Sequence, residues 1–319
     1  MTTVIALDPG FGNTKVCLGG QTTVLQSAVS RPRLLGLAAV GMKSAQQVDK
    51  VTIDGQTFAI GAGAWNHGDL LGGMDYTGLG SLERRALFFG GLSYLLEPGS
   101  AVSGILMVGL PVPLLQDQTQ AEAVFSRLKA FKGLHTFQVN QNTYQVQIDR
   151  LKILAQPVGA YANWLLDEEL RVRKNGNQSE VAVLDIGMNT LDLFVLQGGQ
   201  VTPRFVGGGK VGVRRLLEMI RADGFDLQEL DDALRQGELR VSKDELEVWM
   251  DEILASVEPI WPNLRRFSAV IPTGGGALLL GELLRLALVS KGAAVHWPED
   301  PITANVLGLW KWGCYVSAR

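Results

Sequence analysis

Cysteine and histidine are scarce in this chain. Its 319 residues include two cysteines, Cys17 and Cys314, which provide neither a disulfide framework nor the spacing of metal ligands. There are three histidines, and His67 has no cysteine or other histidine close to it in the sequence, so we interpret it as a surface residue. A disulfide-stabilised scaffold and a cysteine–histidine metal site are therefore not expected.

The sequence also lacks a long apolar run and an excess of basic charge. Its most apolar stretch, residues 101–115, contains Pro111 and Pro113 and is too short to span a bilayer. The first residues have no basic region of a secretory signal, and neither end of the chain is an amphipathic membrane helix. The net charge of −3 argues against direct binding to nucleic acid. We expect a cytoplasmic protein that binds neither a membrane nor, directly, nucleic acid.

What the sequence does contain is enough apolar material for large cores. Apolar residues make up 46% of the chain and charged residues 19%, which is typical of a folded protein. A chain of 319 residues is long enough for two domains.

The first turn of the chain is rich in glycine and follows an apolar run. Residues 3–7 predict a buried strand, residues 16–18 predict the returning strand, and the turn reads Asp8-Pro9-Gly10-Phe11-Gly12-Asn13-Thr14-Lys15. Glycine allows backbone N–H groups to approach an anion closely, and adjacent N–H groups in a turn form an anion-binding nest. Lys15 adds positive charge, and Asp8 is able to hold a hydrated Mg²⁺ ion. Taken alone, this segment is equally well explained as a glycine hairpin with an incidental lysine.

The same pattern recurs about half a chain later. Residues 181–184 predict a buried strand, and a second strand is expected to run through Leu196. The turn between them reads Asp185-Ile186-Gly187-Met188-Asn189-Thr190-Leu191-Asp192. Two copies of this order indicate two similar domains, each with one phosphate-facing hairpin. Coincidence between two glycine turns is the alternative.

Two further glycine segments accompany predicted helices. Gly207-Gly208-Gly209-Lys210 precedes a helical pattern at 213–220, and a helix N-terminus behind glycines is able to receive an anion or a ribose. Thr273-Gly274-Gly275-Gly276-Ala277 follows a strand expected at 269–272, at the end where open α/β sheets bind ligands. We further expect helices over 156–173, 278–289 and 301–312, and a last strand over 294–297.

Rival phosphate-binding motifs are missing. The sequence has no G-x-x-x-x-G-K-[ST] loop, no G-x-G-x-x-G segment that opens a helix after the first strand, and no kinase H-R-D set. The order of its segments instead resembles the actin, DnaK-type chaperone and sugar-kinase superfamily. In this resemblance residues 8–15 are the first phosphate loop, 185–192 the second, and 271–278 the adenosine motif. Residues 156–160 and 303–308 resemble the two connecting helices.

Within this superfamily the sequence is most similar to bacterial and archaeal actin-like proteins of the plasmid-segregation (ParM/StbA) type, which share the D-x-G-x-G-N-T-K loop. The resemblance implies an α/β, actin-like fold with two related ribonuclease H-like lobes around a nucleotide cleft. The first domain is expected to comprise residues 1–155 and 303–319, with a small insertion subdomain at about 28–100. The second is expected to comprise residues 156–302, with a small subdomain at about 211–267.

The resemblance also implies roles for individual residues. Asp8 and Asp185 would orient a hydrated Mg²⁺ ion, and Lys15 would stabilise charge on the transferring phosphoryl group. Gln156 would position the attacking water, although a neutral amide is a poor base and leaves the rate of hydrolysis open. Lys210 would reach the ribose or base, with a solvated surface lysine as the alternative. The residues expected to contact the nucleotide are Gly10, Phe11, Gly12, Asn13, Thr14, Lys15, Gly187, Met188, Asn189, Thr190, Gly208, Gly209, Lys210, Gly274, Gly275 and Gly276.

The function implied by the resemblance is a filament-forming ATPase that segregates plasmid or other DNA, with ATP or GTP and Mg²⁺ as its ligands. Its partners would be further copies of the same chain and a DNA-bound adaptor protein. A small-molecule kinase of the same superfamily is an alternative, although such kinases usually lack the lysine at the position of Lys15. A membrane-associated actin of shape or division is another. A chaperone is less expected, because no substrate-binding domain follows Trp312.

Overall fold

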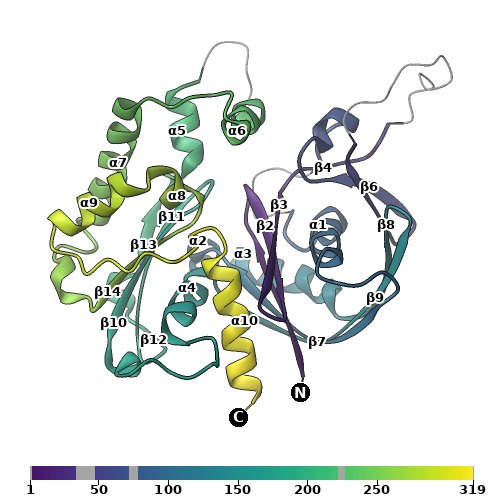
Figure 1. Ribbon diagram of the computed structural model, residues 1–319, viewed down its shortest axis with the longest axis horizontal. Helices are drawn as coiled ribbons and strands as arrows, with labels where there is room; N and C mark the ends of the chain where they lie inside the picture. The colour runs from purple at the N-terminus through teal and green to yellow at the C-terminus, as the bar shows by residue number, and fades with distance from the viewer. Residues whose placement is uncertain (1, 34–46, 72–77, 222–226, 319) are drawn as a thin grey trace. The chain divides into compact units, whose positions relative to one another are not determined.

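The chain forms two compact units, which are described one at a time. The computed structural model describes residues 2–33, 47–71, 78–221 and 227–318. Unit 1 comprises residues 1–110, 114–154 and 313–319, and unit 2 comprises residues 111–113 and 155–312 (Figure 1). Parts of the expected subdomains at 28–100 and 211–267 lie outside the described residues. The domain boundaries inferred from the sequence stay a proposal.

Unit 1 is built on one nine-stranded sheet. The strand order is β3-β2-β1-β7-β9-β8-β5-β6-β4, in which β1 and β7 run parallel and β1 and β2 antiparallel. Its strands are β1 (Thr3–Pro9), β2 (Asn13–Leu18), β3 (Gln21–Gln26), β4 (Val29–Ser30), β5 (Asp49–Ile53), β6 (Gln56–Ile60), β7 (Ala101–Leu110), β8 (Gly133–Val139) and β9 (Asn142–Ala155). Between β5 and β6, Asp54 and Gly55 have φ angles of 50° and 73°, as a two-residue hairpin turn requires.

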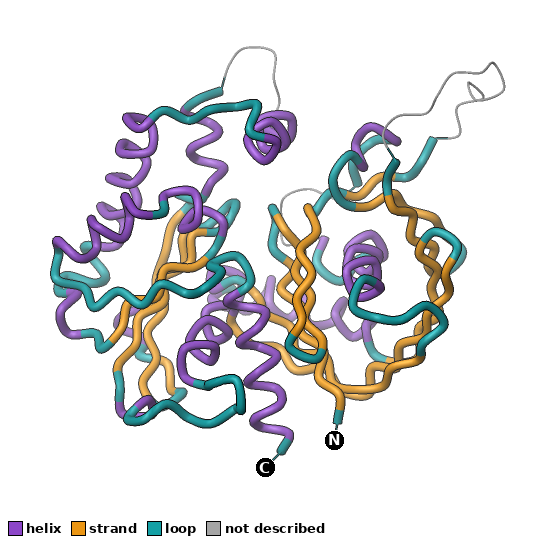
Figure 2. The backbone as a smooth tube through the Cα atoms, viewed as in Figure 1, coloured by secondary structure: helices purple, strands orange, loops and turns teal. Residues whose placement is uncertain are grey.

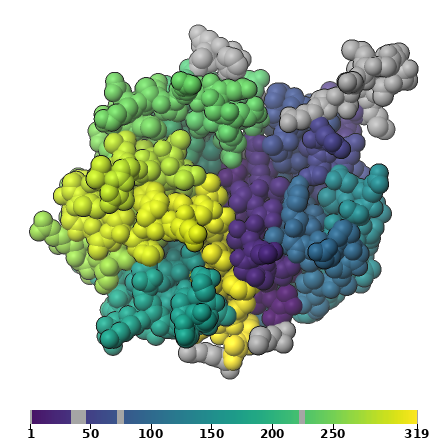
Figure 3. All heavy atoms as spheres, in the orientation of Figure 1, coloured from purple at the N-terminus to yellow at the C-terminus, as the bar shows by residue number. Residues whose placement is uncertain are grey.

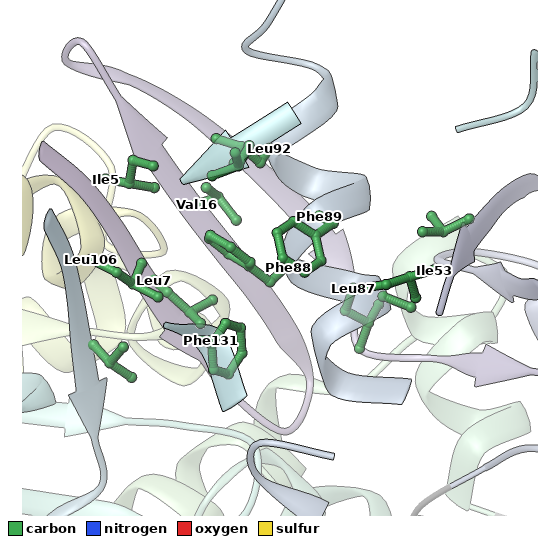
Figure 4. Close-up of a cluster of buried hydrophobic side chains, with 14 of the residues drawn as sticks. Ile5, Leu7, Val16, Ile53, Leu87, Phe88, Phe89, Leu92, Leu106 and Phe131 are labelled. Atoms are coloured by element: carbon green, nitrogen blue, oxygen red, sulfur yellow. The ribbon is translucent and has the colours of Figure 1, made fainter. Parts of the chain in front are cut away.

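Helix α1 (Leu82–Ser93) fills the core of unit 1. It begins at the N-cap Ser81, whose hydroxyl accepts the N–H of Arg84, and strands of the sheet lie on both sides of it (Figure 2). Phe88 and Phe89 point from α1 toward the side chains of the sheet, and all of these side chains are buried (Figure 4). Ala86, Phe89 and Leu92 of this helix are fully buried. The other helices of this part of the chain are α2 (Val112–Gln116) and α3 (Gln118–Leu128).

Unit 2 has a five-stranded sheet with helices around it. The strand order is β12-β11-β10-β14, and β13 pairs with β11; β10 and β14 run parallel. Its strands are β10 (Glu180–Ile186), β11 (Leu191–Gln197), β12 (Gln200–Val201), β13 (Gly207–Gly209) and β14 (Ala269–Thr273). Its helices are α4 (Gln156–Leu165), α5 (Val213–Met219), α6 (Leu227–Gln236), α7 (Lys243–Val257), α8 (Gly275–Leu280), α9 (Glu282–Ser290) and α10 (Ala304–Ser317), of which α10 continues into unit 1. The C-terminal segments, in yellow, form much of the visible face of unit 2 (Figure 3).

The helix expected over 156–173 is shorter than the sequence suggested. Helix α4 ends at Leu165, and Leu166 then forms an isolated bridge with Val172. The carboxylate of Asp167 accepts the N–H groups of Glu169 and Arg171, which closes a turn. A short acidic side chain competes with the helix for nearby backbone N–H groups in this way, and the prediction of a longer helix was wrong.

The C-terminal elements also differ from the sequence-based expectation. Instead of one helix over 278–289 there are two, α8 and α9, separated by Gly281 with a φ of 52°. Instead of a strand over 294–297 there is one isolated bridge, between Val270 and Val295. Helix α10 begins at Ala304 rather than 301, because Asp300 accepts the N–H of Ile302 and the hydroxyl of Thr303.

Two glycines allow α4 and α10 to cross at backbone contact. A Cβ atom at Gly308 would lie 1.7 Å from the carbonyl oxygen of Gly159, and one at Gly159 would lie 2.1 Å from that of Asn305. Backbone atoms cannot give way as a flexible side chain does. The crossing therefore requires glycine at both positions.

Replacing Gly308 by alanine is expected to destabilise the protein by about 1–3 kcal/mol, the usual cost of overpacking. Urea unfolding measures this change. Gly275→Ala is the matched control, because a Cβ atom at Gly275 has nothing within 4 Å and should change stability by less than about 0.5 kcal/mol. Equal unfolding midpoints for the two variants would contradict the close crossing.

Candidate functional site

The first glycine turn joins β1 to β2 and carries a buried ion pair at its base. Asp8 and Lys15 are directly opposite each other in the antiparallel pair, and Lys15 Nζ lies 3.0 Å from Asp8 Oδ2. The Asp8 side chain is 1% exposed and that of Lys15 12%. A Cβ atom at Gly10 would lie 3.2 Å from Lys15 Nζ, so the ammonium group lies beside the glycine turn. Positive charge and close backbone approach thus occur together, as an anion site requires.

Ser27 holds this turn in shape, a role that the sequence analysis did not assign. Its hydroxyl donates to the carbonyl oxygen of Gly10 at 2.6 Å and lies 2.8 Å from the hydroxyl of Thr14. Its N–H donates to the carbonyl oxygen of Gly12. The Thr14 hydroxyl is buried beside Ser27 and supports the turn.

The second glycine turn repeats the first hairpin in unit 2. Asp185 and Asp192 are directly opposite each other on β10 and β11, as Asp8 and Lys15 are on β1 and β2. The N–H of Gly187 donates to the carbonyl oxygen of Thr190 and closes the turn. The two hairpins therefore share one register but differ in charge, because a carboxylate occupies the place of the lysine.

The surroundings of Asp192 therefore disfavour the charged form of its carboxyl group. Burial is the main reason that the pKa of Asp192 is raised well above its ordinary value, and the facing Asp185 raises it further. The N–H of Val112 and the hydroxyl of Thr190 act in the opposite direction. Among the described residues, Asp192 Oδ1 is a buried atom without a hydrogen-bond partner. A cation or a proton in this place would relieve the repulsion.

Side chains and backbone from two distant segments border Asp185. Asn305, on α10, donates from Nδ2 to Asp185 Oδ2 at 2.7 Å. Thr273 is the neighbour of Asp185 on β14. A Cβ atom at Gly274 would lie 2.6 Å from Asp185 Oδ1. The sequence analysis assigned Asn305 no role, because a contact between residues 120 positions apart leaves no local signal in the sequence.

The three glycines after β14 differ in the space that surrounds them. A Cβ atom at Gly274 or Gly276 would collide with Asp185 or Ile186, so these two glycines serve packing inside unit 2. Gly274 also has a φ of 87°, which favours glycine. Gly275 has open space where its Cβ atom would lie. Of the three, Gly275 is the one whose open side leaves room for a ligand.

Gly208 and Gly209 lie on strand β13, which pairs with β11. The first N–H groups of α5, from Val213 and Arg214, donate to the carbonyl oxygens of Gly187 and Met188 and so support the second turn. The expected contact of Gly208, Gly209 and Lys210 with the nucleotide stays a prediction. Lys210 is exposed, and the structure records no ion pair for it among the described residues.

Gln156 is the first residue of α4, directly after strand β9. Its side chain is buried, with 7% of the residue exposed, and Pro157 follows at the second helical position, where proline is tolerated. Helix α4 packs against β10, β11 and β14, so Gln156 belongs to the same unit as Asp185.

The hairpins fit a hydrated Mg²⁺ ion better than a bare one. Among the described residues, no group of three or more His, Cys, Asp or Glu side chains is placed to hold a metal ion. Mg²⁺ usually binds through one or two carboxylates, keeps several waters and shares the phosphates of its substrate. Within unit 2, Asp185 supplies oxygen atoms of that kind, as does Asp192, whose Oδ1 has no hydrogen-bond partner among the described residues. Within unit 1, Asp8 supplies them.

Two α/β units, each with an Asp-bearing glycine hairpin at its sheet, make up an actin-like fold. Residues 6–159 match the family model described as "Actin like proteins N terminal domain". The resemblance inferred from the sequence is thereby confirmed. The comparison with curated protein sequences found no match.

Solved structures similar to this chain cover nearly its whole length. The actin-like protein Alp7A is 15% identical with a TM-score of 0.73, covering 100% of this chain and 97% of that one. The archaeal actin homolog Ta0583, in complex with ADP, is 17% identical with a TM-score of 0.70, covering 100% of both chains. A 15-stranded ParM filament from Clostridium botulinum is 16% identical with a TM-score of 0.67, covering 98% of this chain and 99% of that one. At such identities the likeness shows the fold.

Within the described ranges, none of the helices combines the length and the apolar character needed to cross a membrane.

Proposed function

We propose that this protein is an actin-like nucleotide hydrolase, using ATP or GTP with Mg²⁺, that assembles into filaments in the cytoplasm and segregates plasmid or other DNA through a DNA-bound adaptor. The observation that carries the proposal is the pair of hairpins with one register, Asp8 opposite Lys15 and Asp185 opposite Asp192. Each hairpin has a glycine turn that suits a phosphate group. We assign a phosphate-binding role to each hairpin.

The first hairpin would bind phosphate through its backbone and its lysine. The N–H groups of residues 10–14 would donate to phosphate oxygens, in a turn that Ser27 holds in shape. Lys15 would leave part of its interaction with Asp8 and stabilise negative charge as it develops on the transferring phosphoryl group.

The second hairpin would bind the terminal phosphate and orient the reaction. The backbone of residues 187–190 would hold the phosphate, and Gln156 would hold the attacking water by its amide. Asp185 and Asp8 would accept hydrogen bonds from the waters around the ion. Bound Mg²⁺ supplies positive charge that neutralises the phosphates. Because an amide is a poor base, we expect slow hydrolysis after assembly rather than rapid turnover.

Two of the similar structures support the assignment of nucleotide and filament. The Ta0583 structure contains ADP, and the Clostridium botulinum ParM structure is a filament. Self-association by contact between two different surfaces produces open filaments rather than closed rings when the rotation does not close.

Sedimentation with nucleotide tests this function. With ATP or GTP and Mg²⁺ the protein should enter the pellet at micromolar concentration, and with ADP or without nucleotide it should stay in the supernatant. Electron microscopy of the pellet should show filaments. A protein that remains monomeric in every condition would refute the proposal, and phosphate transfer to a panel of sugars would replace it with a kinase. Co-sedimentation with lipid vesicles in the absence of nucleotide would favour a membrane-associated actin.

A further inference from the structure

Asn305 makes a buried contact with the proposed Mg²⁺-binding carboxylate from a different part of the chain. Its amide nitrogen Nδ2 lies 2.7 Å from Asp185 Oδ2, and the two residues are 120 positions apart. Asn305 is 3% exposed and Asp185 6%. A hydrogen bond to an ionised carboxylate inside a protein is among the stronger ones.

The orientation of the Asn305 amide follows from charge. A carboxylate is an acceptor, so the group that faces Asp185 has to be the donor NH₂ and not the carbonyl oxygen. The other end of the amide, Oδ1, is buried and has no partner among the described residues. Among the described residues, the Asn305 side chain therefore makes its hydrogen bond to Asp185.

The backbone around Asn305 has little freedom to move. Its carbonyl oxygen packs against Gly159 at the close crossing of α4 and α10. A Cβ atom at Gly159 would lie only 2.1 Å from this oxygen. On the opposite side of the carboxylate, Gly274 lies against Asp185 Oδ1. The carboxylate is thus held at one oxygen by a side chain of α10 and bordered at the other by the turn after β14.

We propose that Asn305 is a positioning residue that fixes the orientation of the Asp185 carboxylate for hydrated Mg²⁺. This inference rests on the proposed function, because Asp185 matters for Mg²⁺ only if the protein binds a Mg²⁺–nucleotide complex. Asn305 itself touches neither the ion nor the nucleotide. Residues that orient metal-binding groups in this way typically contribute about 10- to 100-fold to metal affinity.

The test compares Asn305→Ala with wild type and with Lys311→Met. Lys311 is also a buried polar residue of α10, but its Nζ pairs with Glu168 at 2.7 Å and lies 3.4 Å from the carbonyl oxygen of Leu166. Binding of a fluorescent ATP analogue is measured with and without Mg²⁺. Asn305→Ala should reduce the Mg²⁺-dependent gain in affinity by about tenfold or more. Lys311→Met should retain the wild-type gain even where it lowers the unfolding temperature.

The outcomes separate the positioning role from the function itself. If wild type gains no affinity from Mg²⁺, the proposed function fails, and the positioning role fails with it. If wild type and Asn305→Ala gain equally, only the positioning role is overturned.

A second measurement uses the protein without nucleotide. In a double-mutant cycle of Asn305→Ala and Asp185→Ala, the shifts in urea midpoint should be clearly less than additive, because each change removes the same hydrogen bond. Additive shifts would mean that the two side chains do not interact, and would overturn the inference without involving the nucleotide.

Discussion

Replacing Lys15 by glutamine should lower the rate of nucleotide hydrolysis by about 10²- to 10³-fold, which corresponds to about 2.7–4 kcal/mol of lost transition-state stabilisation. The ammonium group lies beside the first glycine turn, and a neutral amide of similar length cannot neutralise charge on the transferring phosphoryl group. Single-turnover hydrolysis at saturating nucleotide and Mg²⁺ measures this effect. Asp185→Ala should also abolish hydrolysis, since it removes the carboxylate of the other hairpin.

The effect of losing the ion pair with Asp8 on stability has to be distinguished from the effect of losing Lys15 on the rate of hydrolysis. Asp8 is buried, so losing the charge of Lys15 also lowers the stability of unit 1. Urea unfolding of Lys15→Gln defines conditions in which the variant is fully folded, and hydrolysis is compared there. Lys132→Gln, which removes an exposed lysine, is the matched control and should keep the wild-type rate. Wild-type turnover in Lys15→Gln would refute the role assigned to the first hairpin.

Replacing Asp192 by asparagine should stabilise the protein at pH 8, in the absence of Mg²⁺ and nucleotide, by about 1–3 kcal/mol, a large effect for a single substitution. Asparagine keeps the shape of the side chain and removes the repulsion by Asp185. Because burial and Asp185 raise the pKa of Asp192, the folded state holds the proton more tightly than the unfolded state. The contribution of Asp192 to stability is therefore most favourable below the unfolded pKa of about 3.9 and is lost as the pH rises through the folded pKa.

Urea unfolding at several pH values between 4 and 8 measures this dependence. The difference between Asp192→Asn and wild type should be close to zero at pH 4 and should grow with pH. Asp251→Asn, a change at an exposed carboxylate of α7, is the control and should show little difference at any pH. A difference that does not vary with pH would mean that Asp192 is not a buried carboxylate facing Asp185.

Local patterns predicted much of the fold. The apolar runs at 3–7 and 181–184 are strands of the structure, and each is followed by a glycine turn and a returning strand. Helix α7 begins where Ser242 and Glu245 form a capping box, within three residues of sequence. Such elements are predictable because the groups that stabilise them are neighbours in the chain.

Elements whose ends depend on competing contacts were less predictable. Helix α4 stops at Leu165 although its apolar pattern continues, because Asp167 draws nearby N–H groups into a turn. The glycines at 207–209 pair with β11 as a strand, which the sequence analysis did not predict. Glycine carries no side chain to mark this pairing, so the sequence contains little sign of it.

The two hairpins and their equivalent positions follow from local sequence, because strand, turn and returning strand are adjacent and the turn sets the register. The same register places Asp8 opposite a lysine and Asp185 opposite Asp192. The environment of each carboxylate depends instead on tertiary packing. Burial raises the pKa of Asp192, and α10 brings Asn305 to Asp185 from 120 positions away. Both depend on how distant segments pack, and packing has no local pattern in the chain.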